Sequence, residues 1–161
     1  KRQLQYYNKK NIDKIIGLEP SVHMQKLAKK KLNDFDVDFE LITEMAEEIP
    51  LKSNSIDSVV CTYTLCSISN PKLALSEIKR VLKKDGKFIF TEHAASPNLK
   101  INKFQKKIEP LWKVIADGCH LTRDIRTMLA VNGFNVDSSN EIYLPGTPKF
   151  IGYHIWGLLK K

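Results

Sequence analysis

The sequence predicts an α/β fold with a mostly parallel sheet whose strands are joined by crossover helices. Three observations carry this prediction. Apolar runs of strand length alternate with stretches whose apolar residues recur at helical spacing. Gly, Pro, Asn and Ser fall between these runs, as turn residues do. Two strand-like runs follow each other near the C-terminus, and we expect an antiparallel strand there to close the sheet.

The chain begins with a predicted strand, helix and strand. The first strand is the apolar run 14–18, which is followed by Glu19-Pro20-Ser21. Residues 37–41 alternate apolar and polar side chains, as a half-buried strand does. The helix between them is predicted by apolar residues at helical spacing, namely Met24, Leu27, Ala28 and Leu32.

A second strand, helix and strand follow. Residues 56–65 are mostly apolar and rich in Val, Thr and Tyr, which predicts a central strand buried on both faces. Asn70 is the expected helix cap, with Pro71 at the first helical position. We expect residues 84–86 to end this helix and residues 87–92 to form the next strand. The inward stripe of the helix is predicted to be Ala74, Ile78, Val81 and Leu82.

The last third of the chain begins with an amphipathic stretch within residues 94–120, which we expect to form helices over the edge of the sheet. Within it, Phe104 and Trp112 are predicted to pack as core or lid residues, although flanking lysines also suit a lipid surface. Thr122 is the expected cap of a further helix. Residues 134–143 and 150–158 form the closing pair of predicted strands.

Composition excludes several classes of protein. The 161 residues are 42% hydrophobic and 27% charged, which disfavours disorder, a collagen-like chain and a disulfide scaffold. No apolar run approaches the roughly 20 residues of a membrane span. Three cysteines without a CxxC spacing suit a reducing compartment, so we expect a cytoplasmic location. The net charge of +8 permits contact with nucleic acid or anionic lipid, but scarce arginine argues against a specific nucleic-acid partner.

Candidate site residues follow the predicted strands, because ligands of open α/β sheets bind at the carboxyl ends of strands. These ends are Glu19, residues 43–47, residues 61–66 and Glu92-His93. A carboxylate directly after a strand, as at Glu19, suits the two hydroxyls of a ribose. A solvated turn carboxylate is the alternative.

Three runs, 16–20, 46–60 and 77–87, resemble the class I S-adenosylmethionine-dependent methyltransferases of the ubiquinone/menaquinone-biosynthesis type. Two further runs, 109–113 and 117–123, together with Glu92-His93, are similar to a narrower branch that methylates small-molecule thiols. The resemblance implies one methyltransferase-like domain over 1–161, with a Rossmann-like sheet that is mostly parallel and has a closing antiparallel strand. In this domain residues 94–121 would form a helical cover over the acceptor site.

The resemblance also implies roles for particular residues. Glu19 matches the acidic residue that binds the ribose hydroxyls of S-adenosylmethionine, and Ala46 and Glu47 match the loop that borders adenine. Cys61 and Thr62 fall beside the methionine part of the cofactor. The family's glycine-rich loop has no counterpart, since no GxG occurs, and we therefore expect the sheet to be N-terminally incomplete. The missing strand would lie between those ending near Glu19 and Cys61, exposing backbone groups and apolar surface.

The expected reaction is methyl transfer from S-adenosylmethionine to a small lipophilic or thiol acceptor. His93, with Glu92, is the first candidate to take the proton of a thiol, and Asp117 is the second catalytic candidate. Cys119 and His120 could shape the acceptor site or orient His93. For each of these residues a structural role is the alternative. No metal is expected, because the four histidines are dispersed and adjacent residues rarely bind the same ion.

Two other functions fit parts of the pattern. A nicotinamide-dependent oxidoreductase could also use Glu19, but no GxGxxG motif is present. A catalytically silent fragment or degenerate copy could use the positive charge to bind RNA or a membrane surface.

Overall fold

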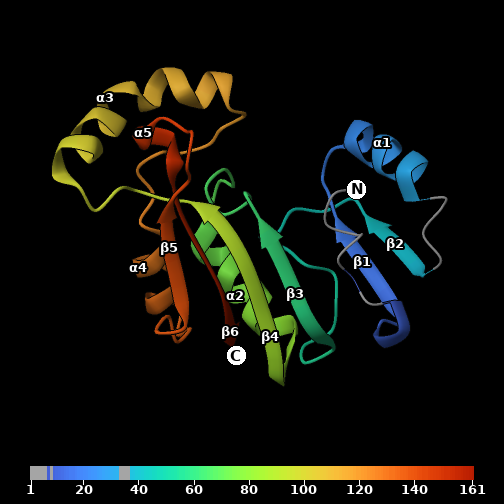
Figure 1. Cartoon of the computed structure of the whole chain (residues 1–161). Helices are drawn as coiled ribbons and strands as arrows, with labels where there is room; N and C mark the ends of the chain where they lie inside the picture. The colour runs from blue at the N-terminus through green and yellow to red at the C-terminus, as the bar shows by residue number, and fades with distance from the viewer. Residues whose placement is uncertain (1–6, 8, 33–36) are drawn as a thin grey trace. The chain divides into compact units, whose positions relative to one another are not determined.

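The computed structural model describes residue 7 and residues 9–32 and 37–161, which form two compact units, residues 1–50 and residues 51–161. The first unit contains a short 3-10 helix (Lys9–Asn11), strand β1 (Lys14–Leu18), helix α1 (Val22–Leu32) and strand β2 (Asp38–Ile42) (Figure 1). β1 and β2 are parallel, with Lys14 opposite Asp38 and Leu18 opposite Ile42. The strand, helix and strand predicted from the apolar runs are confirmed.

Helix α1 exposes much of the apolar stripe that predicts it. Met24 is 51% exposed and Leu27 is 40% exposed, whereas Gln25 is buried. Within residues 22–30 of α1, the buried side chain is therefore an amide, which the apolar periodicity does not reveal.

The second unit has eight elements: β3 (Ile56–Thr62), α2 (Pro71–Val81), β4 (Leu82–His93), α3 (Leu99–Ile115), α4 (Ile125–Val131), β5 (Ser139–Tyr143), α5 (Lys149–Gly152) and β6 (Tyr153–Lys160). They form a four-stranded sheet in the order β3-β4-β6-β5. β3 is parallel to β4, and β6 is antiparallel to both of its neighbours. The single closing antiparallel strand is thus confirmed.

β3 is an edge strand in the described structure, which corrects the expectation of a central strand buried on both faces. Only β4 pairs with it among the described residues, and Val60 is 40% exposed. The apolar run predicted the strand correctly, but burial also requires a neighbour on the second edge. No described ladder joins β1 or β2 to this sheet.

The start of α2 agrees with the sequence, and its end does not. Asn70 accepts a hydrogen bond from the N–H of Leu73 at 3.1 Å, and Pro71 opens the helix. The helix ends at Val81, several residues before the expected stop at 84–86, because the chain turns directly into β4. Residues 83–86 bulge out of the ladder, and a Cβ on Gly86 would lie 2.8 Å from a backbone oxygen, so only glycine fits there.

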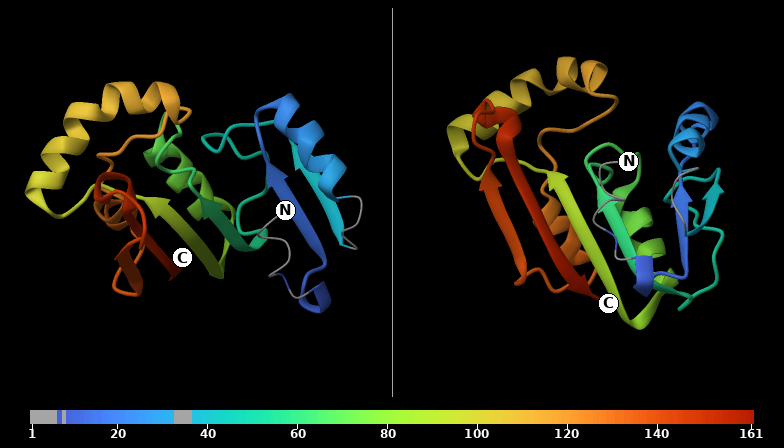
Figure 2. Two further views of the ribbon diagram at one scale, coloured as in Figure 1. Left: turned by 45° about the horizontal axis from the view of Figure 1, so that its top comes forward. Right: turned by 45° about the vertical axis from the view of Figure 1, so that its right-hand side comes forward.

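The core lies on one face of the four-stranded sheet, under α2 and α4, which Figures 1 and 2 show on the same side. Phe88 stacks on Phe90 and tilts against Phe134. The predicted inward stripe of α2 is confirmed for Ala74, Ile78 and Val81, whereas Leu82 is buried as the first residue of β4. The largest buried apolar side chains are Leu65, Leu75, Leu82, Phe88, Phe90, Leu121, Ile125, Leu129, Ile155 and Leu159.

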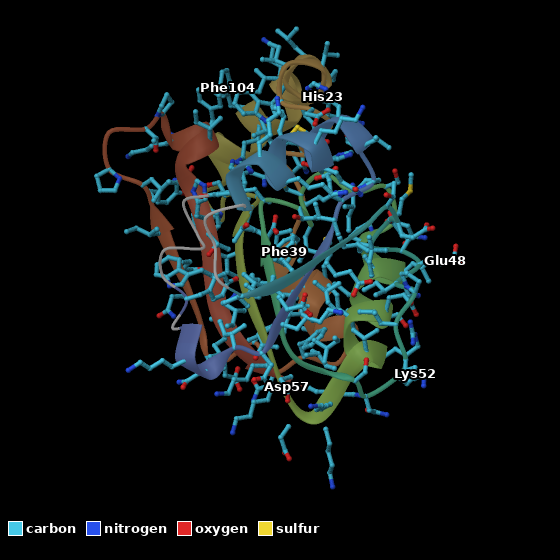
Figure 3. The ribbon with its side chains drawn as sticks, turned by 90° about the vertical axis from the view of Figure 1, so that its right-hand side faces the viewer. His23, Phe39, Glu48, Lys52, Asp57 and Phe104 are labelled. Atoms are coloured by element: carbon cyan, nitrogen blue, oxygen red, sulfur yellow. The ribbon has the colours of Figure 1, made fainter. Side chains whose placement is uncertain are left out.

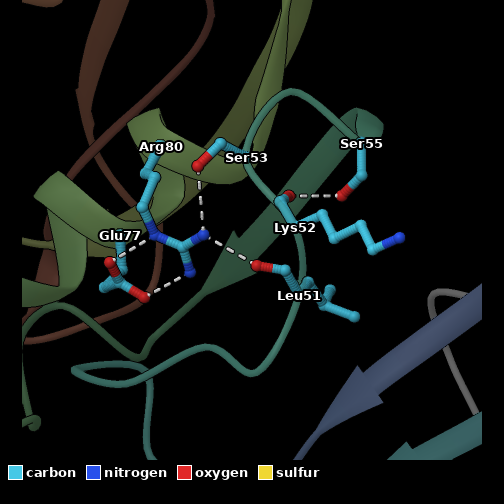
Figure 4. A network of polar contacts seen from close by, with 6 residues as sticks. All are labelled: Leu51, Lys52, Ser53, Ser55, Glu77 and Arg80. Atoms are coloured by element: carbon cyan, nitrogen blue, oxygen red, sulfur yellow. Dashed lines mark hydrogen bonds and ion pairs between the residues drawn. The ribbon is translucent and has the colours of Figure 1, made fainter.

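The loop before β3 is fastened to α2 by one arginine (Figure 4). The guanidinium of Arg80 donates two hydrogen bonds of 2.7 Å to the carboxylate of Glu77. It also donates to the carbonyl of Leu51 at 2.7 Å and to Ser53 Oγ at 3.4 Å. Arg80 thereby positions the chain that enters the sheet.

Three expectations near the C-terminus are corrected. Asp124, and not Thr122, caps α4, accepting from the N–H of Thr127 at 3.0 Å. Of residues 134–143 only Ser139–Tyr143 are a strand, because Phe134 turns into the core. The second closing strand begins at Tyr153, after the short helix α5.

Helix α3 buries a glutamine rather than its apolar residues. Gln105 is fully buried, whereas Phe104, labelled in Figure 3, is 47% exposed and contacts Phe150 edge-on. Trp112 is half-buried and packs on the same ring. The predicted packing thus holds for Trp112 and only in part for Phe104. None of the helices within the described residues has the length and hydropathy to cross a bilayer.

Candidate functional site

In the first unit, one buried amide holds the carboxyl ends of both strands together. Gln25 Nε2 donates to the carbonyl oxygen of Glu19 at 2.7 Å and to Thr43 Oγ1 at 2.8 Å. The N–H of Glu19 donates to the carbonyl of Ile42 at 3.1 Å, which continues the ladder by one residue. Glu19 and the segment that starts at Thr43 therefore share one edge of the β1-β2 pair.

The carboxylate of Glu19 is oriented but not saturated. Its Oε1 accepts from the N–H of Ser21 at 2.9 Å, at the start of α1. Within the described part of the chain Oε2 accepts no hydrogen bond, so it has capacity for an outside donor. A half-buried, fixed carboxylate acceptor at the end of a parallel strand fits the ribose hydroxyls of an adenosine-containing cofactor.

Ala46 and Glu47 lie in the turn that follows β2. The turn is closed by a 3.1 Å hydrogen bond from the N–H of Glu48 to the carbonyl of Met45. Ala46 and Glu47 are half-buried, whereas Met45 is 59% exposed. The structure thus places both predicted adenine-side residues in the loop that leaves the same strand edge as Glu19.

In the second unit, Glu92 organises the loop that follows β3. Its carboxylate is fully buried and accepts hydrogen bonds from the N–H groups of Thr64 at 2.9 Å and Cys66 at 3.1 Å. Burial raises the pKa of Glu92, and hydrogen bonds from the loop oppose that shift. Glu92 was expected to act with His93 on a proton, but its oxygens are occupied by the backbone.

The two predicted residues at the end of β3 differ in their surroundings. Cys61 is buried and its Sγ lies 3.5 Å from Glu92 Oε1. Burial and the nearby carboxylate raise the pKa of this thiol well above its usual value. Thr62 is half-buried, and its carbonyl accepts from Thr64 Oγ1 at 3.2 Å. Since the Cys61 side chain is turned toward Glu92, a ligand would meet this residue through its backbone.

The same loop is held from its other side by the segment after α3. Arg123 Nη1 donates to the carbonyl of Leu65 at 2.5 Å, and the N–H of His120 donates to the carbonyl of Cys66 at 2.8 Å. Tyr63 has a positive φ of 52°, which marks the sharp turn out of β3. The loop 63–68 is thus held from two sides. Glu92 of β4 binds its N–H groups, and His120 and Arg123 bind its carbonyl groups.

His120 is bound to Glu109 of α3 and makes no described hydrogen bond to His93. Its Nδ1 lies 3.1 Å from Glu109 Oε1, while Oε2 accepts from Thr122 N–H at 2.8 Å and Thr122 Oγ1 at 2.6 Å. Burial alone would raise the pKa of Glu109, but Thr122 and His120 together hold it below its usual value. His120 and Thr122 therefore fasten the chain after α3 back onto that helix.

His93 is buried at the end of β4, opposite His154 in the ladder to β6. The two rings meet edge to face with centroids 5.5 Å apart, and Tyr63 packs on His154 at the same distance. Neither ring nitrogen of His93 has a hydrogen-bond partner among the residues described. Burial, with a smaller contribution from His154, lowers the pKa of His93 to about 4. The imidazole is therefore neutral at physiological pH.

Asp117 lies elsewhere, in the turn after α3, with a positive φ of 48° and an exposed side chain. In the described structure no hydrogen bond or ion pair joins it to His93, whose ring nitrogens have no partner there. The two predicted catalytic residues are thus not a connected pair.

A cavity of about 460 Å³ lies in the second unit and is bordered by α3, α4 and the strands β5 and β6. Its polar lining includes Lys106, Arg126, Glu141 and Tyr153, and neither His93 nor Asp117 lines it. Helix α3 therefore borders a cavity whose lining does not include the predicted catalytic residues. Among the described residues, no three His, Cys, Asp or Glu side chains are grouped to hold a metal ion.

Sequence reasoning missed three residues that shape these sites: Gln25, Gln105 and Arg123. Each is polar and donates a hydrogen bond to a backbone carbonyl: Gln25 to that of Glu19, six residues away, Gln105 to that of Phe150, 45 residues away, and Arg123 to that of Leu65, 58 residues away. The sequence shows only that an amide or a guanidinium occurs within a predicted helix or loop. That observation does not identify the backbone group to which the side chain binds.

Comparison with known proteins gives one family match. A family model described as a methyltransferase domain matches residues 2–90. Among curated proteins, thiol S-methyltransferase TMT1B of Rattus norvegicus is 37% identical over 115 residues, 69% of this chain and 47% of that protein. Thiol S-methyltransferase TMT1A of Homo sapiens is 32% identical over 152 residues, 92% of this chain and 62% of that protein. The chain thus spans about half to three fifths of the length of these relatives.

The similarity extends to other methyltransferases and to solved structures. The ubiquinone/menaquinone biosynthesis C-methyltransferase UbiE of Campylobacter jejuni is 37% identical over 83 residues, 52% of this chain and 34% of that protein. A putative methyltransferase structure from Bacillus halodurans superposes with a TM-score of 0.73 at 18% identity, covering 92% of this chain and 83% of that one. A similar structure from Thermotoga maritima gives a TM-score of 0.64 at 21% identity, with 90% and 72% coverage. At these identities the structures show the fold alone.

Proposed function

Because the chain belongs to the methyltransferase domain family, we propose that the protein transfers a methyl group from S-adenosylmethionine to a small thiol or similar lipophilic acceptor. The observation that carries the acceptor class is the 32% identity to a thiol S-methyltransferase over 92% of the chain. Membership confirms the resemblance noted in the sequence, and the solved structures confirm the Rossmann-like α/β fold. The cofactor of this family is S-adenosylmethionine.

The chain's own residues suggest how the cofactor would be held. When bound, S-adenosylmethionine supplies an electrophilic methyl group on a sulfonium. The carboxylate of Glu19 would accept hydrogen bonds from the ribose hydroxyls, and Ala46 and Glu47 would border the adenine. The backbone of Cys61 and Thr62 would lie along the methionine portion. Positioning a nucleophile in line with the methyl group would then account for much of the rate.

His93 is a weak general base for this chemistry. Proton transfer from a thiol of pKa about 8.5 to an imidazole of pKa about 4 costs about 6 kcal/mol. Efficient bases have a pKa near the working pH. We therefore propose that His93 contributes a neutral hydrogen-bond acceptor to the acceptor site and does not take the full proton.

We propose that Arg123 supplies the positive charge that favours the thiolate of the acceptor. The half-buried guanidinium of Arg123 is held against the loop after β3 by its bond to Leu65. A fixed cation of this kind stabilises a thiolate within a few ångströms. Asp117, which is exposed in the turn before this segment, is proposed to lie at the rim of the acceptor site.

Binding of S-adenosylhomocysteine tests the cofactor half of the proposal. In isothermal titration of the full gene product, we expect Glu19→Ala to weaken binding by at least about tenfold, since a charged hydrogen bond is lost. Glu44→Ala is the matched control, because Glu44 is exposed in the loop after β2, and it should leave the affinity unchanged. Absence of any binding heat at millimolar ligand would reject the proposal and favour the catalytically silent module.

The acceptor half needs a separate assay. The protein is incubated with labelled S-adenosylmethionine and either an alkyl thiol or a quinol of similar hydrophobicity. We expect the label on sulfur of the thiol. Label on the quinol alone would reject the thiol class while leaving methyl transfer intact.

A second proposal concerns the partner of α3: we propose peripheral contact with an anionic bilayer surface. The exposed apolar side chains of this helix are Leu99, Phe104, Leu111, Val114 and Ile115. Five lysines and a single glutamate lie on the same helix, so its charge complements anionic lipid. We also propose a cytoplasmic location, because all three cysteines are free thiols.

Vesicle sedimentation tests this contact. We expect the protein to pellet with vesicles containing phosphatidylserine and not with pure phosphatidylcholine. The double variant Leu111→Ser with Ile115→Ser should abolish pelleting, whereas Val131→Ser, which is 73% exposed on α4, should not. Equal recovery of all three proteins in the supernatant would contradict the proposal.

A further inference from the structure

Two thiols that the proposed mechanism does not use lie against each other in the second unit. Cys66 belongs to the loop after β3, Cys119 follows α3, and each side chain affects the pKa of the other. The backbone fixes this approach, because the N–H of His120 donates to the carbonyl of Cys66 at 2.8 Å. A Cβ on Gly118 would lie only 3.6 Å from the carbonyl oxygen of Ser67, so the two segments are in close contact.

The two thiols are not equivalent. Cys66 is only 2% exposed, whereas Cys119 is half-buried and can meet a small reagent. The interaction with Cys66 is the largest cause that lowers the pKa of Cys119 to about 7, and the charge of Arg123 assists. The same interaction and burial raise the pKa of Cys66. At neutral pH Cys119 is thus the nucleophile and Cys66 the proton-bearing partner.

We propose that Cys66 and Cys119 form an oxidisable dithiol that small disulfides, such as glutathione disulfide, convert to an intramolecular disulfide. The Cys119 thiolate attacks one sulfur of the small disulfide, which forms a mixed disulfide and releases one thiolate that takes a proton from water. Cys66 then loses its proton and attacks Cys119 Sγ, which forms the internal bond and releases the second small thiol. The dithiol is oxidised by two electrons, and the small disulfide is reduced to two thiols.

Cys61 does not take part in this exchange. Its thiol is buried against Glu92, and no described contact joins it to Cys119. The segments that carry Cys66 and Cys119 are already held together by the hydrogen bonds from His120 to Cys66 and from Arg123 to Leu65. The disulfide would tie the loop after β3 covalently to the segment after α3, closing a chain loop that is large enough to stabilise the fold.

The test measures thiols and mass, not methyl transfer, so its outcome is independent of the proposed activity. The full chain is reduced, freed of reductant and incubated with glutathione disulfide near pH 7.5. We expect a mass loss of about 2 Da and two fewer alkylatable thiols, with a peptide map linking Cys66 to Cys119. We also expect the thermal midpoint of the oxidised form to rise by several degrees.

Variants separate the two steps. Cys66→Ala should stop at a single glutathione adduct on Cys119, Cys119→Ala should give no internal bond, and Cys61→Ala should still form the bond. If Cys66→Ala does not fold, the wild-type chain can be titrated with phenylarsine oxide, which bridges two neighbouring thiols. We expect one equivalent to block two thiols. Three free thiols after prolonged oxidation, a bond that uses Cys61, or no stoichiometric arsenical binding would each overturn the proposal.

Discussion

The carboxylate of Glu92, near the end of β4, accepts a hydrogen bond from the backbone N–H of Thr64 at 2.9 Å. Through this bond and a second one from Cys66, a single side chain of one strand determines the path of the loop that leaves its neighbour. That loop carries the chain away from Cys61 and Thr62, the residues proposed to lie beside the cofactor. Glu92 therefore positions the loop after β3, because its carboxylate accepts hydrogen bonds from N–H groups of that loop.

Removing this carboxylate should destabilise the fold. We expect Glu92→Ala to lower the free energy of unfolding by about 2–5 kcal/mol, because two buried N–H groups lose their acceptor. Glu92→Gln should cost less, since one oxygen is retained. Chemical denaturation followed by circular dichroism measures both values. Asp85→Asn, at an exposed position of the same strand, should change stability by less than about 0.5 kcal/mol. An equally small effect of Glu92→Ala would show that the loop does not depend on this residue.

His93 should impose a pH dependence on stability. Its pKa falls from 6.5 to about 4 on folding, so the unfolded chain binds more protons between these values. Stability from this group is complete above about pH 6.5 and is lost as the pH falls toward 4, with a total of about 3 kcal/mol. Denaturation midpoints of the wild type and of His93→Leu, measured between pH 4 and 7.5, check this.

The variant should show a flatter profile than the wild type over that window. His23→Gln is the control, because it removes a histidine at an exposed position of α1 and leaves the core intact. Parallel profiles for His93→Leu and the wild type would contradict a neutral, buried imidazole.

The sequence predicted correctly the helix and strand ends that depend only on neighbouring residues. Asn70 and Pro71 mark the start of α2, and the apolar run 14–18 with Glu19 marks β1 and its end, because capping and strand periodicity depend on neighbouring residues only. The direction of the closing strand was also predicted. The burial of β3 was not, since it depends on which strands flank both of its edges.

Long-range polar contacts explain most of what the sequence did not predict in the site. Gln105 is the buried residue of α3, and its amide binds the N–H of Ser96 and the carbonyl of Phe150. The apolar period of the helix does not predict this burial. His120 pairs with Glu109, which lies eleven residues away and whose side chain has no distinguishing local pattern. Such pairs are defined by the folded backbone, and a sequence gives only the residue types that are able to form them.

The arginine that fastens the loop before β3 offers a further prediction. We expect Arg80→Met to lower the free energy of unfolding by about 1–2 kcal/mol, because the carbonyl of Leu51 loses its donor and Glu77 loses a bidentate partner. Arg80→Lys should recover only part of this loss, since an ammonium lacks the planar fork. Lys72→Met, at an exposed position of the same helix, is the matched control. Equal stability of Arg80→Met and the control would mean that the network contributes nothing measurable.

Gln105 should be the most sensitive position of α3. Its Oε1 accepts from the N–H of Ser96 at 2.9 Å, and its Nε2 donates to the carbonyl of Phe150 at 2.9 Å and more weakly to that of Ala94. We expect Gln105→Leu to cost about 2–4 kcal/mol, despite being more apolar, because at least two buried backbone groups lose their partners.

The matched control is Lys103→Leu, an equally apolar replacement at an exposed position two residues away. Gln105→Glu separates the two halves of the contact, because a carboxylate still accepts from Ser96 but donates nothing to Phe150. Above pH 6 we expect it to be markedly less stable than the wild type, because its charged carboxylate would be buried against the carbonyl oxygens of Phe150 and Ala94. If Gln105→Leu unfolds at the same denaturant concentration as Lys103→Leu, the amide does not hold α3 in place, and the exposed apolar residues of this helix then need another anchor.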